Sequence, residues 1–246
     1  MPYTDSNGVR IYYEVEGNAD GPPLVLQHGL TGYLESWRER GYTNVLGDDY
    51  RLILIDARGH GRSDKPHEPE AYVRELRAAD VVGVLDDLGI GKTNYFGYSM
   101  GGRIGCALLS HAADRLNCAV MGGFNPYATA SAATIAPSSE EFARGIDTRP
   151  NLIPEVRARL LSNDLVALRA STVGSAGPAM TDGALDHDLP ILLFSGENDA
   201  PIDGARKAAG EATNGQFFVV PGADHQGAIS DVEFVGPLVK AFLDSV

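Results

Sequence analysis

Six short, continuous apolar runs constrain the fold of this chain more than any other feature. They lie at residues 23–27, 51–55, 93–97, 117–121, 191–194 and 216–220. Strands that are buried on both faces of a parallel sheet have this pattern. Helical periodicity separates several of the runs, at residues 70–88, 101–113, 204–212 and 230–244. We therefore expect an α/β fold, with a mostly parallel sheet, right-handed crossovers and helices on both faces.

Two segments depart from this alternation. Residues 9–15 alternate apolar and polar side chains after an Asn7-Gly8 turn signal, which predicts a hairpin at an edge of the sheet. Residues 125–188 form a long gap with helix-like pieces at 138–146 and 154–162. A gap of this length favours a small helical cap inserted between two core strands, and a mobile linker at 128–139 is the alternative. We expect a core of residues 1–124 and 189–246, with a cap (lid) insertion at 125–188.

Length and charge limit the class of protein. A chain of 246 residues fits one α/β domain, and the net charge of -13 without a basic cluster predicts no nucleic acid and no membrane partner. The sequence shows no signal-like segment at its start and no long apolar span, so we expect a cytoplasmic protein. We expect a monomer or a homodimer. Cys106 and Cys118 lie in apolar surroundings without C-x-x-C spacing, which predicts two free thiols.

The stretch Gly-Tyr-Ser-Met-Gly at residues 97–101 follows an expected strand and precedes an expected helix. In this context the G-x-S-x-G pattern predicts a nucleophile elbow, a sharp turn that exposes the hydroxyl of Ser99. Gly97 and Gly101 leave room for that turn. A serine hydroxyl is a weak nucleophile without a base, so a histidine and an acid are needed at other strand ends.

The base and the acid are expected near the C-terminal end of the chain. Of the six histidines, His225 alone lies downstream of every expected core strand. Asp199 follows the run at 191–194 and is the favoured acid, with Glu197 and Asp203 as alternatives at the same strand end. The chain order Ser99, Asp199, His225 is the one expected for this elbow.

An acyl-transfer site also needs backbone donors for the oxyanion. The expected donors are the N–H of Met100, directly after the nucleophile, and the N–H of Leu30, in the loop after the first apolar run. His28, in the same loop, is interpreted as a buried structural residue. His60, in the loop after the second run, is interpreted in the same way.

Five ordered motifs resemble the α/β-hydrolase superfamily, in its serine-nucleophile, carboxylesterase-like branch. They are QHG at 27–29, DARGHGRSD at 56–64, GYSMGG at 97–102, GEND at 196–199 and GADH at 222–225. The resemblance implies an α/β-hydrolase fold with an eight-stranded, mostly parallel sheet and a helical cap. Serine at position 99 argues against the epoxide hydrolase and haloalkane dehalogenase branches, which have aspartate there.

The resemblance and the residues together predict a serine esterase that cleaves a small, uncharged carboxylic ester or lactone. Alternatives with the same triad are a carbon-carbon bond hydrolase, an enol-lactonase or a menaquinone-pathway-like lyase. The stretch GYSMGGR, with Arg103, resembles the lyase. A further alternative is a small-molecule receptor on the same fold. No metal or organic cofactor is expected, because the sequence carries no motif for one. The expected substrate-binding residues are Tyr33, Trp37, Phe124 and Tyr127, and further candidate pocket walls are Leu30, Tyr98, Met100, Phe142, Leu152 and Ile153.

Overall fold

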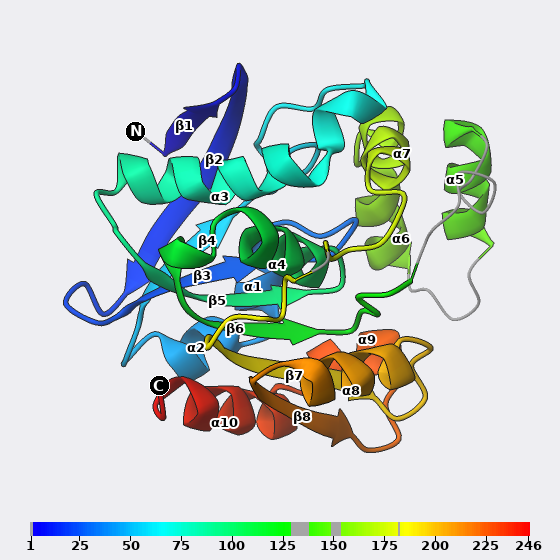
Figure 1. The fold of residues 1–246 in the computed structure, drawn as a ribbon. Helices are drawn as coiled ribbons and strands as arrows, with labels where there is room; N and C mark the ends of the chain where they lie inside the picture. Colours follow the sequence, from blue (N-terminus) through cyan, green and yellow to red (C-terminus); the bar gives the residue numbers. More distant parts are fainter. Residues whose placement is uncertain (1, 129–137, 149–153, 182) are drawn as a thin grey trace.

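An eight-stranded sheet forms the centre of the molecule (Figure 1). The structure, a computed structural model, describes residues 2–128, 138–148, 154–181 and 183–246. The strand order is β1-β2-β4-β3-β5-β6-β7-β8, and β2 pairs antiparallel with both of its neighbours while the other pairs are parallel. The strands are β1 (Tyr3–Ser6), β2 (Val9–Gly17), β3 (Pro23–Gln27), β4 (Arg51–Ile55), β5 (Thr93–Tyr98), β6 (Leu116–Gly122), β7 (Pro190–Gly196) and β8 (Asn214–Val220). The expected mostly parallel α/β sheet is confirmed.

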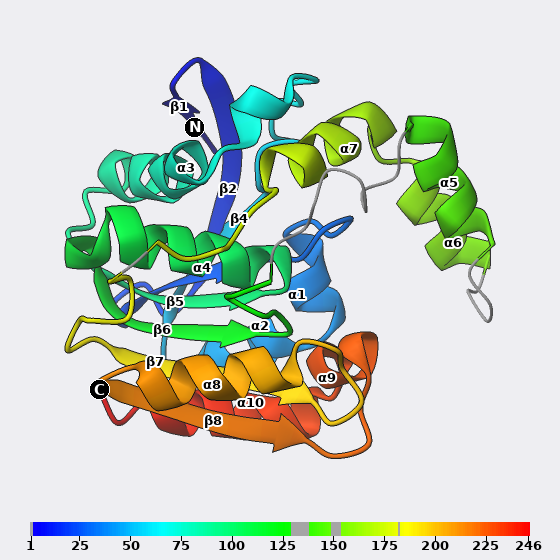
Figure 2. The same cartoon turned by 45° about the vertical axis from the view of Figure 1, so that its right-hand side comes forward.

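Helices cover both faces of this sheet (Figures 1 and 2). Successive side chains of a strand point to opposite faces, so Val25 packs under one layer while Leu24 and Leu26 pack under the other. The first layer contains α3 (Arg74–Asp87), α4 (Met100–His111) and α8 (Ile202–Glu211). The second contains α1 (Glu35–Glu39), α2 (Tyr42–Leu46), α9 (His225–Ser230) and α10 (Val232–Leu243). Two apolar cores therefore fix the sheet from both sides.

Some short elements were not expected from the sequence. Helices α1 and α2 follow β3, in a stretch where no helical period was recognised, and two 3-10 turns lie at Pro69–Tyr72 and Ala113–Arg115. The helix expected at 230–244 is preceded by α9, and Asp231 begins α10 by accepting a hydrogen bond from Phe234 N. Short helices of this kind carry too few turns to show a period in the sequence.

Three helices lie beyond the carboxyl ends of the central strands (Figure 2). They are α5 (Ser139–Asp147), α6 (Pro154–Leu161) and α7 (Leu165–Gly174), within the segment expected as a cap. Asp164 caps α7 by accepting hydrogen bonds from Val166 N and Ala167 N. The guanidinium of Arg77 in α3 donates to Ser171 O at 2.9 Å, which fastens α7 to the core. The boundaries of the cap stay a prediction, because parts of it lie outside the described residues.

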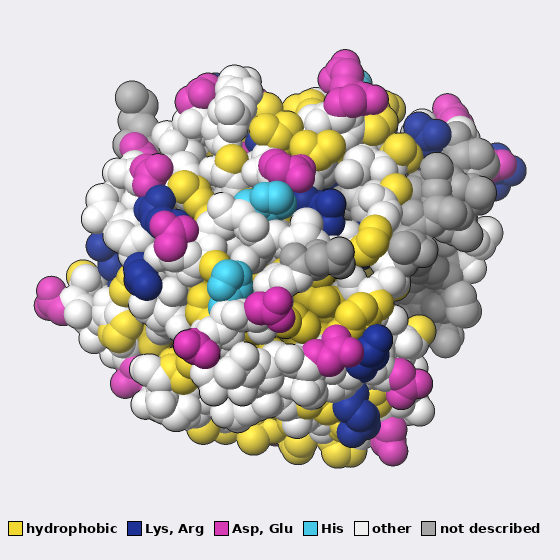
Figure 3. Space-filling model, in the orientation of Figure 1, with side chains coloured by type: hydrophobic (Ala, Val, Ile, Leu, Met, Phe, Trp, Pro, Cys, Tyr) yellow, Lys and Arg dark blue, Asp and Glu magenta, His cyan; other side chains and the backbone are white. Residues whose placement is uncertain are grey.

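Both cysteines are buried and free, as the sequence indicated. Burial raises the pKa of the Cys106 and Cys118 thiols to about 12. Acidic and basic side chains are interspersed on the face of the molecule drawn in Figure 3. Within the described residues, no helix has the length and apolar character needed to cross a membrane.

Replacement of Gly101 tests how tightly α4 is packed on the sheet. A Cβ at Gly101 would lie 2.1 Å from the carbonyl oxygen of Gln27, at the end of β3. Backbone atoms cannot give way easily, so we expect Gly101→Ala to lower the free energy of unfolding by at least about 2 kcal/mol in urea denaturation. Gly91→Ala is the control, because a Cβ there has no atom within 4 Å. Equal stability of both variants would contradict this packing.

Candidate active site

Ser99 occupies a sharp turn between β5 and α4. Its backbone has φ 55° and ψ -109°, a region that residues other than glycine rarely adopt. The N–H of Ser99 donates to Gly122 O at 2.8 Å, which ties the turn to β6. A Cβ at Gly97 would lie 2.4 Å from Gly101 O. The glycine on each side of the serine is therefore required by the close approach of the backbone.

Ser99, His225 and Asp199 form one hydrogen-bonded chain. The Nδ1 of His225 lies 2.8 Å from Asp199 Oδ2, and its Nε2 lies 3.1 Å from Ser99 Oγ. A carboxylate only accepts, so Nδ1 carries the proton and Nε2 is left to accept from the serine hydroxyl. Asp199 is 6% exposed. The three side chains come from the ends of β5 and β7 and from the first residue of α9.

The alternative acids have other surroundings. Glu197 accepts a hydrogen bond from Gly222 N at 2.7 Å, in an exposed loop. Asp203 is exposed in the first turn of α8. Of the three acids, Asp199 is the one that the structure brings to His225.

Tyr98 supports the histidine from behind. Its phenol donates to His225 O at 2.6 Å, and the two rings lie 5.3 Å apart. Burial, followed by the nearby charge of Asp199, raises the pKa of Tyr98. The phenol therefore stays protonated and keeps its hydrogen bond to the backbone of His225.

The loop after β3 lies directly against the serine. A Cβ at Gly29 would lie 3.3 Å from Ser99 Cβ. Leu34 N donates to Asp56 Oδ1 at 2.7 Å, which holds the other end of this loop. Across the described part of the chain, the N–H groups of Leu30 and Met100 have no acceptor. Both amides are available for an oxyanion, and this role stays a prediction.

His28 and His60 are buried in the same region and serve the loops. The Nε2 of His28 accepts from Ala57 N at 3.1 Å, and its Nδ1 donates to Gly29 O at 2.8 Å. The Nδ1 of His60 donates to Arg58 O at 3.0 Å. Burial lowers the pKa of both imidazoles, so they are neutral near pH 7. Within the described residues, neither histidine forms a hydrogen bond with Ser99.

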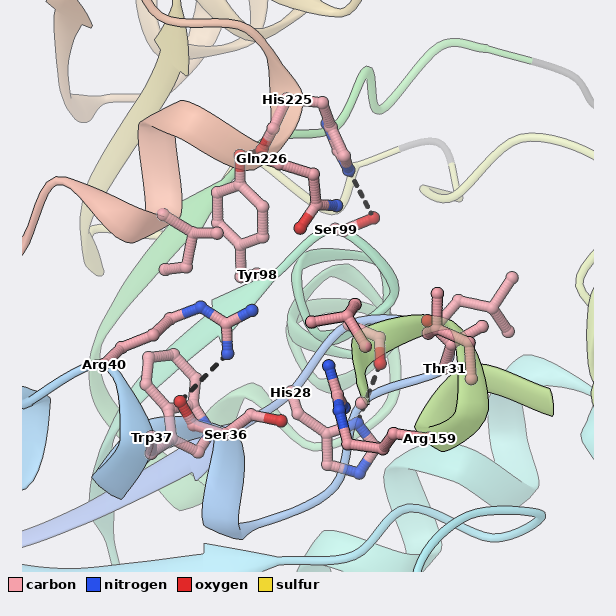
Figure 4. A pocket seen from close by; sticks show the side chains of 16 residues that line it. His28, Thr31, Ser36, Trp37, Arg40, Tyr98, Ser99, Arg159, His225 and Gln226 are labelled. Atoms are coloured by element: carbon pink, nitrogen blue, oxygen red, sulfur yellow. Dashed lines mark hydrogen bonds between the residues drawn. The ribbon is translucent and has the colours of Figure 1, made fainter. Parts of the chain in front are cut away.

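A pocket of about 460 Å³ opens beside Ser99 (Figure 4). Its walls come from the loop after β3, from α1 and the residue after it, and from α6 and α9. Leu30, Trp37, Leu160 and Ile229 supply apolar surface. Arg40, Arg159 and Gln226 supply polar groups to the same lining. Part of the expected cap, helix α6, thus contributes directly to the pocket.

The structure brings only one of the four expected substrate-binding residues into this pocket. Trp37 lines it, whereas the ring of Tyr33 lies outside, with the guanidinium of Arg159 at 5.4 Å from its centre. Phe124 fills the core against Gly102, where a Cβ would lie 2.5 Å from its ring. Tyr127 donates to Glu211 and lies 4.3 Å from the ammonium of Lys207. These three residues therefore lie outside the lining of this pocket, and their role in substrate binding stays a prediction.

Some of the other residues expected in the pocket wall line the pocket, and others do not. Leu30 and Tyr98 line the pocket, and Met100 does not. Leu152 and Ile153 lie outside the described residues, as does the side chain of Phe142. Sequence reasoning missed Arg40, Arg159 and Gln226, because no motif surrounds them and they come together only through the fold.

Arg103 also lies away from the pocket. Its Nη2 donates to Ser175 O and to Gly177 O, both at 2.8 Å. These bonds tie the start of α4 to the segment after α7. In the described parts of the chain, no group of three or more His, Cys, Asp or Glu side chains is suited to a metal ion.

Comparison with known proteins agrees with this architecture. Residues 22–136 match the family model described as "alpha/beta hydrolase fold". Over 99% of this chain and 98% of the relative, the sequence is 25% identical to a putative 2-succinyl-6-hydroxy-2,4-cyclohexadiene-1-carboxylate synthase of Bacillus subtilis.

Two solved structures are similar over the whole chain. The esterase RhEst1 from a Rhodococcus species has a TM-score of 0.80 at 27% identity, covering 100% of this chain and 98% of its own. The enol-lactonase from Burkholderia xenovorans has a TM-score of 0.83 at 23% identity, covering 99% and 100%. These matches confirm the resemblance at the level of the superfamily: the chain belongs to the α/β-hydrolase superfamily.

Proposed function

We propose that this protein is a serine hydrolase that cleaves a small carboxylic ester or lactone through an acyl-enzyme. The observation that carries the proposal is the chain from Asp199 Oδ2 through His225 to Ser99 Oγ, with distances of 2.8 and 3.1 Å. Its geometry is that of an activated nucleophile with an oriented base.

In the first step, Ser99 Oγ attacks the carbonyl carbon of the substrate while His225 Nε2 takes the hydroxyl proton. The carbon–oxygen bond to the alcohol then breaks, and the imidazolium returns the proton to the leaving oxygen. Asp199 holds the Nδ1–H and stabilises the positive charge on the ring. The acyl group remains on Ser99, and for a lactone the alcohol remains attached to it.

In the second step, His225 removes a proton from water, which attacks the acyl carbon. The bond from that carbon to Ser99 Oγ then breaks, the imidazolium returns its proton to Oγ, and the acid is released. Negative charge develops on the carbonyl oxygen in both steps. The N–H groups of Leu30 and Met100 would donate to that oxygen, and each such donor typically contributes about a hundredfold to a thousandfold in rate. Their lack of an acceptor within the described structure supports this role.

The similar proteins support hydrolysis of a carbon–oxygen bond. One of the two structures above is described as an esterase and the other as an enol-lactonase. The elbow residue here is a serine, whereas epoxide hydrolases use an aspartate at that position. We therefore place this chain with the carboxylesterase-like members, with α6 as part of a small cap over the site.

A lyase is the second candidate, because the Bacillus subtilis relative is described as a synthase of a cyclohexadiene carboxylate. In the sequence, Arg103 was the residue that favoured it. The guanidinium of Arg103 instead donates to two backbone carbonyls outside the pocket. Arg103 therefore gives the lyase no support. The other alternative, a small-molecule receptor, would bind its ligand without turnover.

Covalent labelling tests the nucleophile. A fluorophosphonate should react once per chain, on the peptide that contains Ser99, because its phosphorus is attacked by an activated serine oxygen. Mass spectrometry of the digested protein locates the label. The Ser99→Ala variant should remain unlabelled, with Ser63 as an internal control because its Oγ is buried and donates to Asp56 O. Folded wild-type protein that takes up no label would contradict the acyl-enzyme.

Replacement of the acid tests the orientation of His225. We expect Asp199→Asn to lower kcat for a p-nitrophenyl ester on the order of 10⁴-fold, because an amide no longer fixes the proton on Nδ1. Glu197→Gln is the matched control at the same strand end, and its kcat should stay close to that of the wild type. Steady-state kinetics with circular dichroism of both variants provides the measurement. Equal losses in the two variants would exclude Asp199 as the specific partner.

A further inference from the structure

Arg40 is a cation in the pocket wall that forms no ion pair with a carboxylate of the described residues. It follows α1, and its Nη1 donates to Ser36 O at 2.9 Å. Its Nε is buried and has no hydrogen-bond acceptor within the described structure. In Figure 4 the guanidinium points into the pocket next to Tyr98. Within the described residues, the terminal nitrogens of this guanidinium have donors left for a ligand in the pocket.

Arg159 reaches the same pocket from α6. Its guanidinium lies 5.4 Å from the centre of the Tyr33 ring, a cation–π contact that holds it without neutralising it. Among the ion pairs of the described residues, none involves Arg40 or Arg159. Burial, and then the positive charge of Arg159, lowers the pKa of Arg40. The two cations therefore repel each other across the pocket.

The charge of the pocket is opposite to that of the chain. The protein has a net charge of -13, yet the described residues that line the pocket include two arginines and no Asp or Glu. The nearby carboxylates have other partners, since Glu39 accepts from the Tyr33 phenol at 2.6 Å and Asp199 from His225 at 2.8 Å. An anion between the two guanidinium groups would replace their repulsion with attraction on both sides.

We propose that Arg40 and Arg159 form a carboxylate-binding subsite, so that the ester or lactone cleaved at Ser99 carries a carboxylate away from its scissile carbonyl. The proposal rests on the proposed hydrolase function and names its substrate class. A substrate with a carboxylate replaces the uncharged substrate that we expected from the sequence. The sequence did not indicate this site, because the two arginines are far apart in it.

The chemistry of the pocket favours a carboxylate over other anions. A guanidinium donates two parallel hydrogen bonds to a carboxylate, which has two oxygen atoms to share between two such groups. Trp37, Leu160 and Ile229 provide an apolar wall that suits a hydrocarbon chain. A phosphate has more oxygen atoms, and the side chains of Leu160 and Ile229 have no donors for them.

A pair of matched substrates tests the subsite. Mono-p-nitrophenyl adipate carries a terminal carboxylate, and its methyl ester lacks that charge but keeps the chain. We expect the wild type to have the higher kcat/KM with the charged ester. Arg40→Gln and Arg159→Gln should each lower that kcat/KM about tenfold to a hundredfold, mainly through KM, and change the value for the methyl ester little. Arg40→Lys should restore part of the preference, because it keeps the charge.

Arg157→Gln is the matched control on α6. Arg157 pairs with Asp147 at 2.9 Å and does not line the pocket, so its loss should leave the preference unchanged. Thermal unfolding of each variant reports whether it folds. Equal kcat/KM of the wild type for the two esters would overturn the subsite, whatever the variants do.

Binding without turnover separates the subsite from the proposed hydrolysis. Isothermal titration calorimetry of Ser99→Ala with adipate should show one site, which Arg40→Gln and Arg159→Gln weaken in that background. Inorganic phosphate should bind more weakly than adipate. Binding of adipate by a protein that hydrolyses neither ester would contradict the hydrolase and keep the subsite. Absence of binding, or stronger binding of phosphate, would contradict the carboxylate subsite.

Discussion

The site depends on the backbone of Ser99, which is held in a conformation that costs a non-glycine residue on the order of 1–3 kcal/mol. Three surrounding features hold it there: the hydrogen bond from Ser99 N to Gly122 O, the close packing of Gly97 on Gly101, and the contact of Gly101 with Gln27. The first of these requires that β6 lies beside β5 in the sheet, and the third requires that β3 lies on the other side of β5. The strain is therefore supported by the core, and its result is a hydroxyl that faces His225.

Charges near the serine are separated into two groups. On one side Asp199 is buried and hydrogen-bonded to His225, so its negative charge acts on the imidazole. On the other side Arg40 and Arg159 face the pocket without carboxylates. In a low-dielectric pocket such fixed charges act more strongly than on the surface. This arrangement allows a protein of net charge -13 to receive an anion at one place.

The sequence predicts the elements that repeat a strong local pattern. The runs at 23–27 and 51–55 coincide with β3 and β4, because strands buried on both faces are apolar along their whole length. The elbow was recognised because glycine spacing reflects a steric requirement next to Ser99. His225 and Asp199 could be selected because parallel strands bring their carboxyl ends to one edge of the sheet.

The substrate pocket could not be predicted from the sequence, because its lining depends on the direction of side chains and on short helices. Phe124 and Tyr127 are close to the end of β6 in sequence, but their rings pack into the core and against α8. Arg40 enters the pocket because α1 and α2 form after β3, and no period indicated these two helices. Arg159 lines the same pocket because α6 lies beyond the strand ends. Contacts of this kind are set by tertiary packing and leave no local signal.

The most direct test of the acyl-enzyme is the partitioning of products between water and methanol. Esters that share one acyl group but differ in their leaving alcohols should all form the same intermediate on Ser99. The ratio of acid to methyl ester should then be identical for every leaving group at a fixed methanol concentration. A ratio that varies with the leaving alcohol would contradict a common acyl-Ser99 intermediate.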